Sequence, residues 1–430
     1  MERYSEYKDS GVQWLGEIPG HWKTMRLGIL GECSNGVSKS GEYFGEGHPF
    51  VSYSDVYKNI ELPQMVDGLA KSTEDDRQKY SVEYGDVFFT RTSETIQEIG
   101  FSSTCLKTIP NAVFAGFLIR FRPTTKELIP EFSKYYFRCN NLRSFYITRM
   151  NLVTRASLSQ SLLRQLTVTL PPLTEQHSIV SYLDDKCGKI DKMLEGKQKQ
   201  IELLAEMKQR IIADAVTRGL NPDVKMKATN IPWLPEIPEH WSCIKLKAFC
   251  KDNKEKNKGN IESCVLSLSY GNVIVKQNVN FGLVPDNYES YQIVKPGYII
   301  LRLTDLQNDH KSLRTGLVKN RGIITSAYVG LVVNNINCEY VHLLLHSYDV
   351  MKVFYGMGGG LRQSMSYQDI SNLYIPVPPL SEQRSIVSYI TDKTAKIDIL
   401  TSKLQQEIES IKEYKQRLIS DVVTGQIKVC

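Results

Sequence analysis

The residues of this 430-residue chain that could carry out chemistry are few and scattered. His342 and His346 stand four positions apart and would share one face of a helix, where they could hold a metal ion together. No third ligand is evident near them, and the corresponding stretch of the first half has no histidine. We therefore expect a packing or surface role for both histidines.

The glycine-rich stretch GMGGGL (356–361) comes nearest to a phosphate-binding loop. It lacks the Gly-x-Gly-x-x-Gly spacing, because position 361 is leucine, and it follows an expected helix rather than a strand. The chain also lacks a Gly-x-x-x-x-Gly-Lys-Ser/Thr loop, a Pro-Asp…Asp/Glu-x-Lys nuclease pattern, an Asn/Asp-Pro-Pro-Tyr/Phe methylase motif and a serine-hydrolase elbow. Together these absences favour binding over catalysis, so we expect no catalytic residue, metal or cofactor in this chain.

Composition places the chain among ordinary globular proteins. It is too long for one core, so two or more domains are expected. The net charge of +6 is a mild basic excess that suits an anionic partner. No apolar run reaches the ~20 residues of a membrane span, and the nine cysteines form no Cys-x-x-Cys pair. These features predict reduced thiols and a cytoplasmic location.

An internal repeat provides the framework that must position any functional residue. Residues 171–220 match residues 378–427 at 26 of 50 positions without a gap. Upstream, WLGEIPGHW at Trp14 recurs as WLPEIPEHW at Trp233, and these copies hold all four tryptophans. We call them the entry motifs and expect their tryptophans to pack the base of each half. Each half is thus an entry motif, a divergent block and a repeated segment.

The divergent blocks, 23–170 and 242–377, are expected to be strand-rich. YGDVFFTR (84–91) and VKPGYIILRL (294–303) each place a glycine turn before a β-rich apolar run. A helix should follow in each block, over EFSKYYFRCNNLRSFYI and EYVHLLLHSYDVMKVFY. An Arg-x-Ser-x-Ser pattern then recurs, with members Arg155, Ser157 and Ser159 in the first block and Arg362, Ser364 and Ser366 in the second.

The repeated segment is expected to be one long helix. Pro-Pro marks its boundary, Thr174 or Ser381 would be the N-cap, and the pattern stays helical for about 45 residues. Apolar residues recur every seven positions, as in the seam of a coiled coil, with the polar Lys197 at one seam position. The apolar seam residues are Leu183, Ile190, Leu204 and Ile211 in the first helix and Ile390, Ile397, Leu404, Ile411 and Leu418 in the second.

The two helices should pair with each other in antiparallel fashion. A helix of this length spans roughly 65 Å. The roughly 14 residues from Gly219 to Trp233 reach at most ~50 Å when extended, so the chain cannot travel back along the whole helix to start a parallel copy. The predicted fold class is α+β: two tandem pseudo-symmetric halves, each a β-rich domain followed by a long helix, with the helices paired as an antiparallel coiled coil.

The phrases LTVTLPPLTEQHSIVSYLDDKCGKID and LYIPVPPLSEQRSIVSYITDKTAKID resemble the signature of type I restriction-modification specificity subunits. The entry motifs resemble the segment that precedes each target-recognition domain of that family, and the likeness covers essentially the whole chain. The resemblance implies a non-catalytic subunit that binds double-stranded DNA. It also implies two modification subunits that use S-adenosylmethionine and two restriction subunits that use ATP and Mg, so these cofactors would belong to the partners.

In such a subunit each recognition domain would read one half of a split, asymmetric site, and the paired helices would set the gap and dock the modification subunits. Outer-face residues such as Lys186, Lys189 and Glu202 would take part in docking, or form an ordinary charged exterior. The chain would then divide into an entry motif with the first recognition domain (1–170), the first helix (171–220), a linker with the second entry motif and recognition domain (221–377), and the second helix (378–430).

Reading a split site needs cations for phosphates and side chains for base edges in the major groove. The candidates are Arg91 and Arg302 beside predicted strands, Arg155 and Arg362 of the repeated pattern, and the 356–360 loop, where backbone could approach the duplex. The run KDNKEKNKGN (251–260) suits phosphates through Lys251, Lys254, Lys256 and Lys258. For each candidate a structural or surface role is the alternative.

Two other protein classes stay open. A recognition half of a fused restriction-methylase would need a methylase domain in the same chain, and little room precedes the first entry motif. A scaffold protein would show no salt-sensitive binding to duplex DNA. The entry motifs and the repeated segments are similar in the two halves, whereas the blocks between them diverge. This contrast favours the DNA-reading subunit over both.

Overall fold

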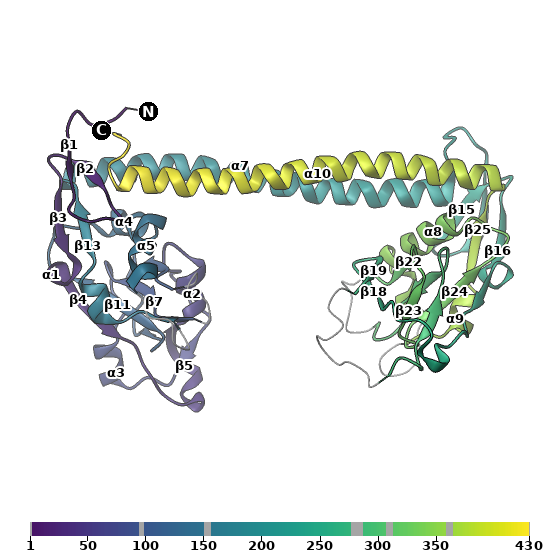
Figure 1. Cartoon of the computed structure of the whole chain (residues 1–430), viewed down its shortest axis with the longest axis horizontal. Helices are drawn as coiled ribbons and strands as arrows, with labels where there is room; N and C mark the ends of the chain where they lie inside the picture. The colour runs from purple at the N-terminus through teal and green to yellow at the C-terminus, as the bar shows by residue number, and fades with distance from the viewer. Residues whose placement is uncertain are drawn as a thin grey trace. The chain divides into compact units, whose positions relative to one another are not determined.

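The computed structural model describes residues 2–93, 99–149, 156–276, 287–306, 313–357 and 364–429 (Figure 1). The chain forms two compact units. Unit 1 comprises residues 1–197 and 406–430, and unit 2 comprises residues 198–405. Each long helix of the repeat therefore contributes one part to each unit.

The entry motif of unit 1 is tied to the segment that leads into the first long helix. β1 (Tyr7–Asp9) and β2 (Glu17–Pro19) form a hairpin. β3 (Lys23–Arg26) pairs with β13 (Thr167–Leu170), so residues from both ends of the first block meet in one ladder. The block's helices are α1 (Leu27–Leu30), α2 (Tyr53–Lys58), α3 (Glu74–Lys79), α4 (Pro130–Tyr136), α5 (Asn140–Arg149) and α6 (Gln160–Arg164).

A four-stranded antiparallel sheet forms the centre of unit 1, in the order β4 (Gly31–Asn35), β11 (Leu118–Pro123), β7 (Val87–Thr90) and β9 (Ser102–Thr104). β7 is buried along its whole length, as its run VFFT predicts. A smaller sheet has the order β10 (Val113–Phe114), β5 (Phe44–Val51) and β6 (Leu69–Ala70), and β8 (Thr92–Ser93) pairs with β12 (Ala156–Ser157).

The single helix predicted after the strands of the first block is wrong, because the structure has two. α4 ends at Tyr136, and Cys139 N donates to Tyr136 O at 3.3 Å in a tight turn before α5 begins at Asn140. The corresponding helix of the second block, α8 (Cys338–Val350), is followed by a 3₁₀ turn at Val353–Gly356.

Unit 2 repeats the plan of unit 1. The hairpin of β14 (Met226–Ile231) and β15 (Leu234–Pro238) replaces β1 and β2, and the pair of β16 (Ser242–Lys245) and β25 (Tyr374–Val377) replaces β3 and β13. Its central sheet has the order β17 (Cys250–Asp252), β24 (Val329–Val333), β21 (Ile299–Leu301) and β22 (Thr315–Leu317). The remaining elements are β18 (Leu266–Ser269), β19 (Asn272–Val275), β20 (Gln292–Val294), β23 (Gly322–Ile324), α9 (Tyr367–Ser371) and 3₁₀ turns at Leu246–Ala248 and Lys258–Asn260.

The glycine turns that precede the buried strands β7 and β21 are equivalent. Gly85 has a φ of +92° and Gly297 a φ of +90°, a left-handed conformation that only glycine adopts at little cost. The turns align β7 with β21 residue by residue, so Phe89 corresponds to Leu301. The two blocks therefore share the central sheet and the turn before its buried strand, as the sequence pattern predicts, whereas their smaller sheets differ.

The repeated segments form the helices α7 (Leu173–Arg218) and α10 (Leu380–Val423). The N-caps predicted at Thr174 and Ser381 are wrong, because both residues lie inside the first turn. The carbonyls of Pro172 and Pro379 accept the first helical hydrogen bonds, from Gln176 N and Gln383 N, each at 3.0 Å. A proline carbonyl can cap in this way because only its N–H is missing.

The antiparallel pairing of α7 and α10 is confirmed within each unit (Figure 1). In unit 1, Lys415 Nζ lies 2.5 Å from Asp191 Oδ1. In unit 2, Lys208 Nζ lies 2.6 Å from Asp398 Oδ1. The repeat relates these two contacts, since Lys208 corresponds to Lys415 and Asp191 to Asp398 at the offset of 207. The same ion pair thus occurs once in each unit with the two helices exchanged.

All predicted seam residues are buried or half-buried. The structure adds a second seam layer, four positions further along each helix, that the sequence pattern did not reveal because several of its members are polar. This second layer consists of Cys187, Leu194, Ile201, Lys208 and Ala215 in α7 and Thr394, Thr401, Ile408, Lys415 and Val422 in α10.

Lys197 is a polar residue of the seam, and we expect its replacement to stabilise unit 1. Its side chain is 17% exposed and its ammonium contacts the carboxylate of Glu407, whereas the corresponding residue of α10 is the buried Leu404. The Glu407 side chain is 56% exposed, so solvent screens this ion pair and it contributes little to stability. A leucine would instead bury apolar surface at the seam, so Lys197→Leu should raise the free energy of unfolding in urea by about 1 kcal/mol. Lys199→Leu, at an exposed position, is the control, and a loss of stability in Lys197→Leu would contradict the expectation.

Candidate nucleic-acid interface

Each entry motif is fastened to the first turn of its long helix by a glutamate. Trp22 is fully buried and its Nε1 donates to Glu175 Oε2 at 2.9 Å. Trp241 donates in the same way to Glu382 Oε2 at 3.0 Å. His21 and His240 contact the same two carboxylates through Nε2. Both carboxylates lie in the first turn of a helix, where the positive end of the helix dipole stabilises their negative charge.

The C-terminal end of each long helix contacts the tryptophan that is hydrogen-bonded to the N-terminal end of the other helix. α7 ends before Gly219 and α10 ends shortly before Gly425, with φ values of +78° and +77°. An added Cβ would lie 3.1 Å from the Trp241 ring at Gly219 and 3.1 Å from the Trp22 ring at Gly425. Trp14 and Trp233 are partly buried against the two cores. We call each entry motif, together with the helix ends that contact its tryptophans, a mount. The two mounts are built from the same contacts.

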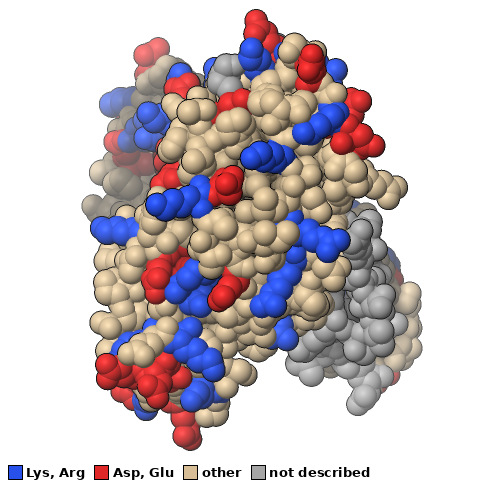
Figure 2. Space-filling model, turned by 90° about the vertical axis from the view of Figure 1, so that its left-hand side faces the viewer, with Lys and Arg blue, Asp and Glu red and all other residues tan. Residues whose placement is uncertain are grey.

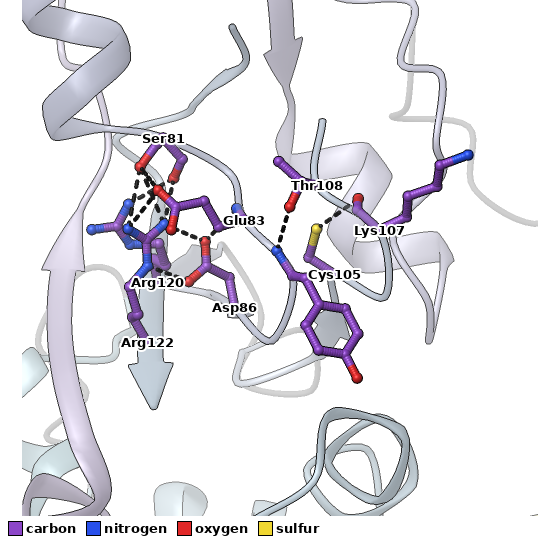
Figure 3. Close-up of polar contacts among 9 residues, drawn as sticks. Ser81, Glu83, Asp86, Cys105, Lys107, Thr108, Arg120 and Arg122 are labelled. Atoms are coloured by element: carbon purple, nitrogen blue, oxygen red, sulfur yellow. Dashed lines mark hydrogen bonds and ion pairs between the residues drawn. The ribbon is translucent and has the colours of Figure 1, made fainter. Parts of the chain in front are cut away.

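A buried ion pair distinguishes the first block from the second. Arg122 Nε and Nη2 donate to the two carboxylate oxygens of Asp86, each at 2.6 Å, and Asp86 is fully buried (Figure 3). These hydrogen bonds raise the pKa of the Arg122 guanidinium. Arg120 Nη1 donates to Ser81 O at 2.6 Å beside the pair. The cluster ties the turn before β7 to β11.

The aligned positions of unit 2 hold different side chains. Gly330, Val332 and Tyr298 stand where Arg120, Arg122 and Asp86 stand in unit 1. The space beside Gly330 is filled by Gln292, whose Oε1 would lie 2.4 Å from an added Cβ. The scaffold is shared, but the interactions built on it are not.

The first block contains a cavity of about 660 Å³ beside the end of β7. Segments 35–39, 91–92 and 115–117 contribute to its wall, together with aromatic residues that precede or begin α2. The complete lining is Asn35, Gly36, Val37, Ser38, Lys39, Phe44, Phe50, Tyr53, Arg91, Thr92, Ala115, Gly116 and Phe117. It joins cationic and amide side chains to aromatic rings, a combination suited to nucleic acid.

The histidine pair lies on α8 in unit 2, with ring centroids 6.3 Å apart. Burial lowers the pKa of His342 to about 4, and the neighbouring His346 adds to this shift. Burial also lowers the pKa of His346. Nowhere in the described part of the chain do three or more His, Cys, Asp or Glu side chains gather as a metal site. The two rings are packing residues of this helix.

Unit 2 should lose stability as the pH falls from 6.5 toward 4. The unfolded chain binds a proton at His342 before the folded chain does, because the folded pKa is about 4 against 6.5. Each pKa unit of the difference between the folded and unfolded chain corresponds to about 1.4 kcal/mol of stability. Because the ring is partly exposed, solvent screening reduces this contribution, and the loss should be on the order of 2 kcal/mol. Urea unfolding at pH 7 and pH 4 measures it against His342→Gln, which does not titrate. A difference between variant and parent that is independent of pH would sink the idea.

Comparison with known proteins decides the family. The model of the type I restriction modification DNA specificity domain matches residues 19–203 and again residues 239–410. The chain belongs to the type I restriction-modification specificity family. Its two matched regions are the two halves of the internal repeat, so this specificity chain carries two tandem recognition domains.

Other members of the specificity family resemble this chain over most of its length. The MjaX specificity subunit of Methanocaldococcus jannaschii is 25% identical over 434 residues, 96% of each chain. The EcoBI specificity subunit of Escherichia coli is 24% identical over 302 residues, 64% of this chain and 61% of that protein.

Solved structures share the fold of this specificity chain. One chain, from a study of complex assembly and conformational transition of the type I R-M system, has a TM-score of 0.66 at 14% identity, covering 95% of this chain and 99% of that one. The HsdS subunit from Thermoanaerobacter tengcongensis has a TM-score of 0.50 at 14% identity, covering 95% and 98%. No helix in the described part of the chain is long and apolar enough to cross a membrane.

The two predicted strand-end arginines of this specificity chain are not equivalent. Leu158 N donates to Arg91 O, whereas its counterpart Met365 donates to Leu303 O. Arg91 therefore aligns with Leu303, and Arg302 aligns with Thr90. Because side chains alternate along a strand, the aligned positions of Arg91 and Arg302 belong to opposite faces of the central sheet. Arg91 is half-buried, lines the cavity, and its Nη1 donates to Gly116 O at 3.4 Å.

The repeated Arg-x-Ser-x-Ser pattern falls partly outside the described residues. Arg155, Arg362 and 358–360 of the glycine loop lie there, so their DNA contacts stay predictions. The last serine of each pattern is a helix cap: Ser159 Oγ accepts from Leu162 N at the start of α6, and Ser366 forms a capping box with Asp369 at α9. This part of the pattern is framework.

The predicted phosphate-binding lysines run from β17, which contains Lys251, to the 3₁₀ turn that begins at Lys258, and a buried asparagine holds the segment between them. Asn257 is fully buried and exchanges hydrogen bonds with the Glu262 backbone. Lys256 Nζ donates to Ser326 Oγ at 2.6 Å. The exposed lysines of this run are Lys251, Lys254, Lys256 and Lys258. Figure 2 shows a face of unit 1, on which blue and red side chains alternate without forming a field of one sign.

Proposed function

We propose that this chain is the DNA-reading subunit of a type I restriction-modification complex. Residues 1–170 and 221–377 would each read one half of a bipartite asymmetric site, and the helices of 171–220 and 378–430 would set the gap and dock two modification subunits. The chain itself contributes no catalytic group. S-adenosylmethionine, ATP and Mg would be used by the modification subunits and by two restriction subunits, in the cytoplasm.

The contrast between conserved mounts and divergent blocks carries this proposal. Glu175 with Trp22 and Glu382 with Trp241 form the same contact at nearly the same distance. The blocks on these mounts share a sheet order but differ in side chains, as the Asp86–Arg122 pair of unit 1 illustrates. A protein that reads two different half-sites needs this combination, whereas a plain scaffold has no use for it.

Mapping N6-methyladenine in the host genome, with the gene intact and deleted, tests the proposal. We expect a split motif, with fixed bases on both sides of an unspecified gap, to lose methylation on deletion. An unchanged methylome, together with no shift of duplex DNA by the purified chain and its neighbouring methylase, would overturn the proposal.

Exchanging one block should change only one half of that motif. Residues 242–377 would be replaced by the corresponding block of another family member, with both mounts and both helices kept. The half-site read by 23–170 should then persist beside a new second half. The reciprocal exchange of 23–170 is the matched control, and a change of both halves by one exchange would contradict independent reading.

The helices offer related apolar positions for two copies of one partner. Met193 and Tyr414 in unit 1 are each about half exposed, and so are Met207 and Leu400 in unit 2. At the repeat offset, Met193 corresponds to Leu400 and Met207 to Tyr414. In the register set by the two Lys–Asp pairs, Met193 lies across from Tyr414, and Met207 lies across from Leu400. Lys186, Lys189 and Glu202 are also exposed, and Lys189 pairs with Asp185.

Charge placed on these apolar positions should reduce the number of bound modification subunits. Met193→Glu is expected to remove one copy, and Met193→Glu combined with Met207→Glu should remove both. The mass of the assembled complex measures the copies, with Lys199→Glu as a control of similar exposure. A double variant that still binds two copies would place docking elsewhere on the helices.

A further inference from the structure

The cavity of unit 1 has the features of a base-reading site. We propose that it receives the major-groove edge of a guanine in the first half-site, with Arg91 donating to the base, Lys39 to a flanking phosphate, and Phe117 packing on the neighbouring base. This inference rests on the proposed function and names the residues through which the first recognition domain would act.

The lining favours an electron-rich partner. It contains the cations Lys39 and Arg91 and, among the described residues that form it, no aspartate or glutamate. Arg91, Lys39, Asn35 and Thr92 all supply hydrogen-bond donors. Guanine presents two acceptors, N7 and O6, in the major groove, and arginine matches them in a bidentate fashion. Asn35 and Thr92 also carry acceptor oxygens, so the choice of guanine rests on the paired donors of Arg91.

The rim of the cavity is held rigid by backbone hydrogen bonds. Val37 N donates to Phe114 O, and Gly116 N donates back to Val37 O, each at 2.8 Å. Arg91 N donates to Phe117 O at 2.9 Å. At Gly36 an added Cβ would lie 2.2 Å from Phe114 O, so only glycine permits this approach. Side chains mounted on such a rim lose little freedom on binding, which favours specific contacts.

Phe117 is placed for contact with a partner rather than for packing. It stands in the turn between β10 and β11 and is 65% exposed, although the neighbouring Leu118 is fully buried. In the major groove of a duplex, such a side chain makes apolar contact with a base edge, as phenylalanine does with the C5 methyl group of thymine. Phe44 and Phe50 also line the cavity, with ring centroids 4.9 Å apart.

Among the described residues, only the first block has an arginine at this position of the strand end. The position of Arg91 is taken in unit 2 by Leu303, which is buried in the core. Arg302 leaves the opposite face of its strand, so it cannot take the same role. Changes at the cavity should therefore affect one half-site and leave the other unchanged, which gives every variant an internal control.

The test uses the chain assembled with its modification subunits and duplexes carrying the split motif found by methylation mapping. We expect Arg91→Gln to weaken binding roughly 10- to 100-fold and to relax the base preference at one guanine of the first half-site. Replacing that guanine by 7-deazaguanine, which lacks N7, should weaken the parent similarly and add little to the loss in Arg91→Gln.

The exposed residues test the same site with less risk to folding. Lys39→Gln should weaken binding to all duplexes and lower the salt dependence by about one phosphate contact. Phe117→Ala should weaken binding at the first half-site only. Lys126→Gln, an exposed lysine outside the cavity, should bind as the parent does.

Two results would overturn the inference while leaving the proposed function intact. The first is parent-like affinity and base preference in Arg91→Gln. The second is an equal loss at both half-sites in Arg91→Gln together with parent-like binding by Lys39→Gln and Phe117→Ala, because Arg91 would then have a structural role only. If the parent complex itself fails to bind the split duplex, the proposed function fails, and the inference fails with it.

Discussion

Replacing Trp22 with alanine should destabilise unit 1 by about 3–5 kcal/mol, and Trp241→Ala should destabilise unit 2 by a similar amount. Both rings are essentially fully buried, and both indole N–H groups donate to a glutamate at the start of a long helix. Each replacement removes the largest apolar side chain of a mount and leaves Glu175 or Glu382 without that donor. The loss therefore combines an empty space with a broken hydrogen bond.

Hydrogen exchange of peptides from the two units localises these losses. Trp22→Ala should raise exchange in unit 1 and Trp241→Ala in unit 2, so each variant serves as the control for the other. Glu175→Gln keeps an oxygen acceptor for Trp22 and should cost much less than Trp22→Ala. Equal exchange changes in both units from one substitution would show that the mounts are not independent.

Removing residues 425–430 should destabilise unit 1 by about 3 kcal/mol, the second-largest effect we expect. Tyr7 Oη donates to Gly425 O at 2.9 Å, Gln426 Nε2 donates to Glu17 O at 2.8 Å, and Lys428 N donates to Glu2 O at 2.9 Å. Ile427 and Val429 pack on the core of unit 1. Three hydrogen bonds at about 0.5–1.5 kcal/mol each, with two half-buried apolar side chains, give this sum.

Urea unfolding of the shortened chain, followed by tyrosine and tryptophan fluorescence, measures this loss. Lys428→Ala keeps the backbone N–H that donates to Glu2 and should unfold as the parent does. A shortened chain with the stability of the parent would mean that the last residues only rest on unit 1.

The sequence pattern predicted what is periodic and repeated. The length of the helices, their antiparallel pairing and one layer of the seam follow from the seven-residue spacing and from the reach of the linker. The second layer did not follow, because Thr394, Thr401 and Lys208 are too polar to stand out. The early start of each helix does not follow from the prolines as boundary residues, because it depends on the carbonyls of Pro172 and Pro379, which accept the first helical hydrogen bonds.

The candidate site was less accessible to prediction because it depends on non-local contacts. Arg91 was named from its place after a strand, but its cavity exists only because residues 35–39 and 115–117 meet. Nothing in the spacing of Lys39 and Phe117 shows that they share a wall. The mismatch between Arg91 and Arg302 also needed hydrogen bonds to Leu158 and Met365 to become visible.

The two Lys–Asp contacts of the helices have an evolutionary consequence. Lys208 with Asp398 and Lys415 with Asp191 are one contact with the helices exchanged, which is the rule of a self-complementary surface between two identical chains. An ancestral gene of half this length would have encoded a protein able to form such a dimer. Joining two copies in one chain lets each block change independently, while a substitution at either shared contact still has to suit its partner on the other helix.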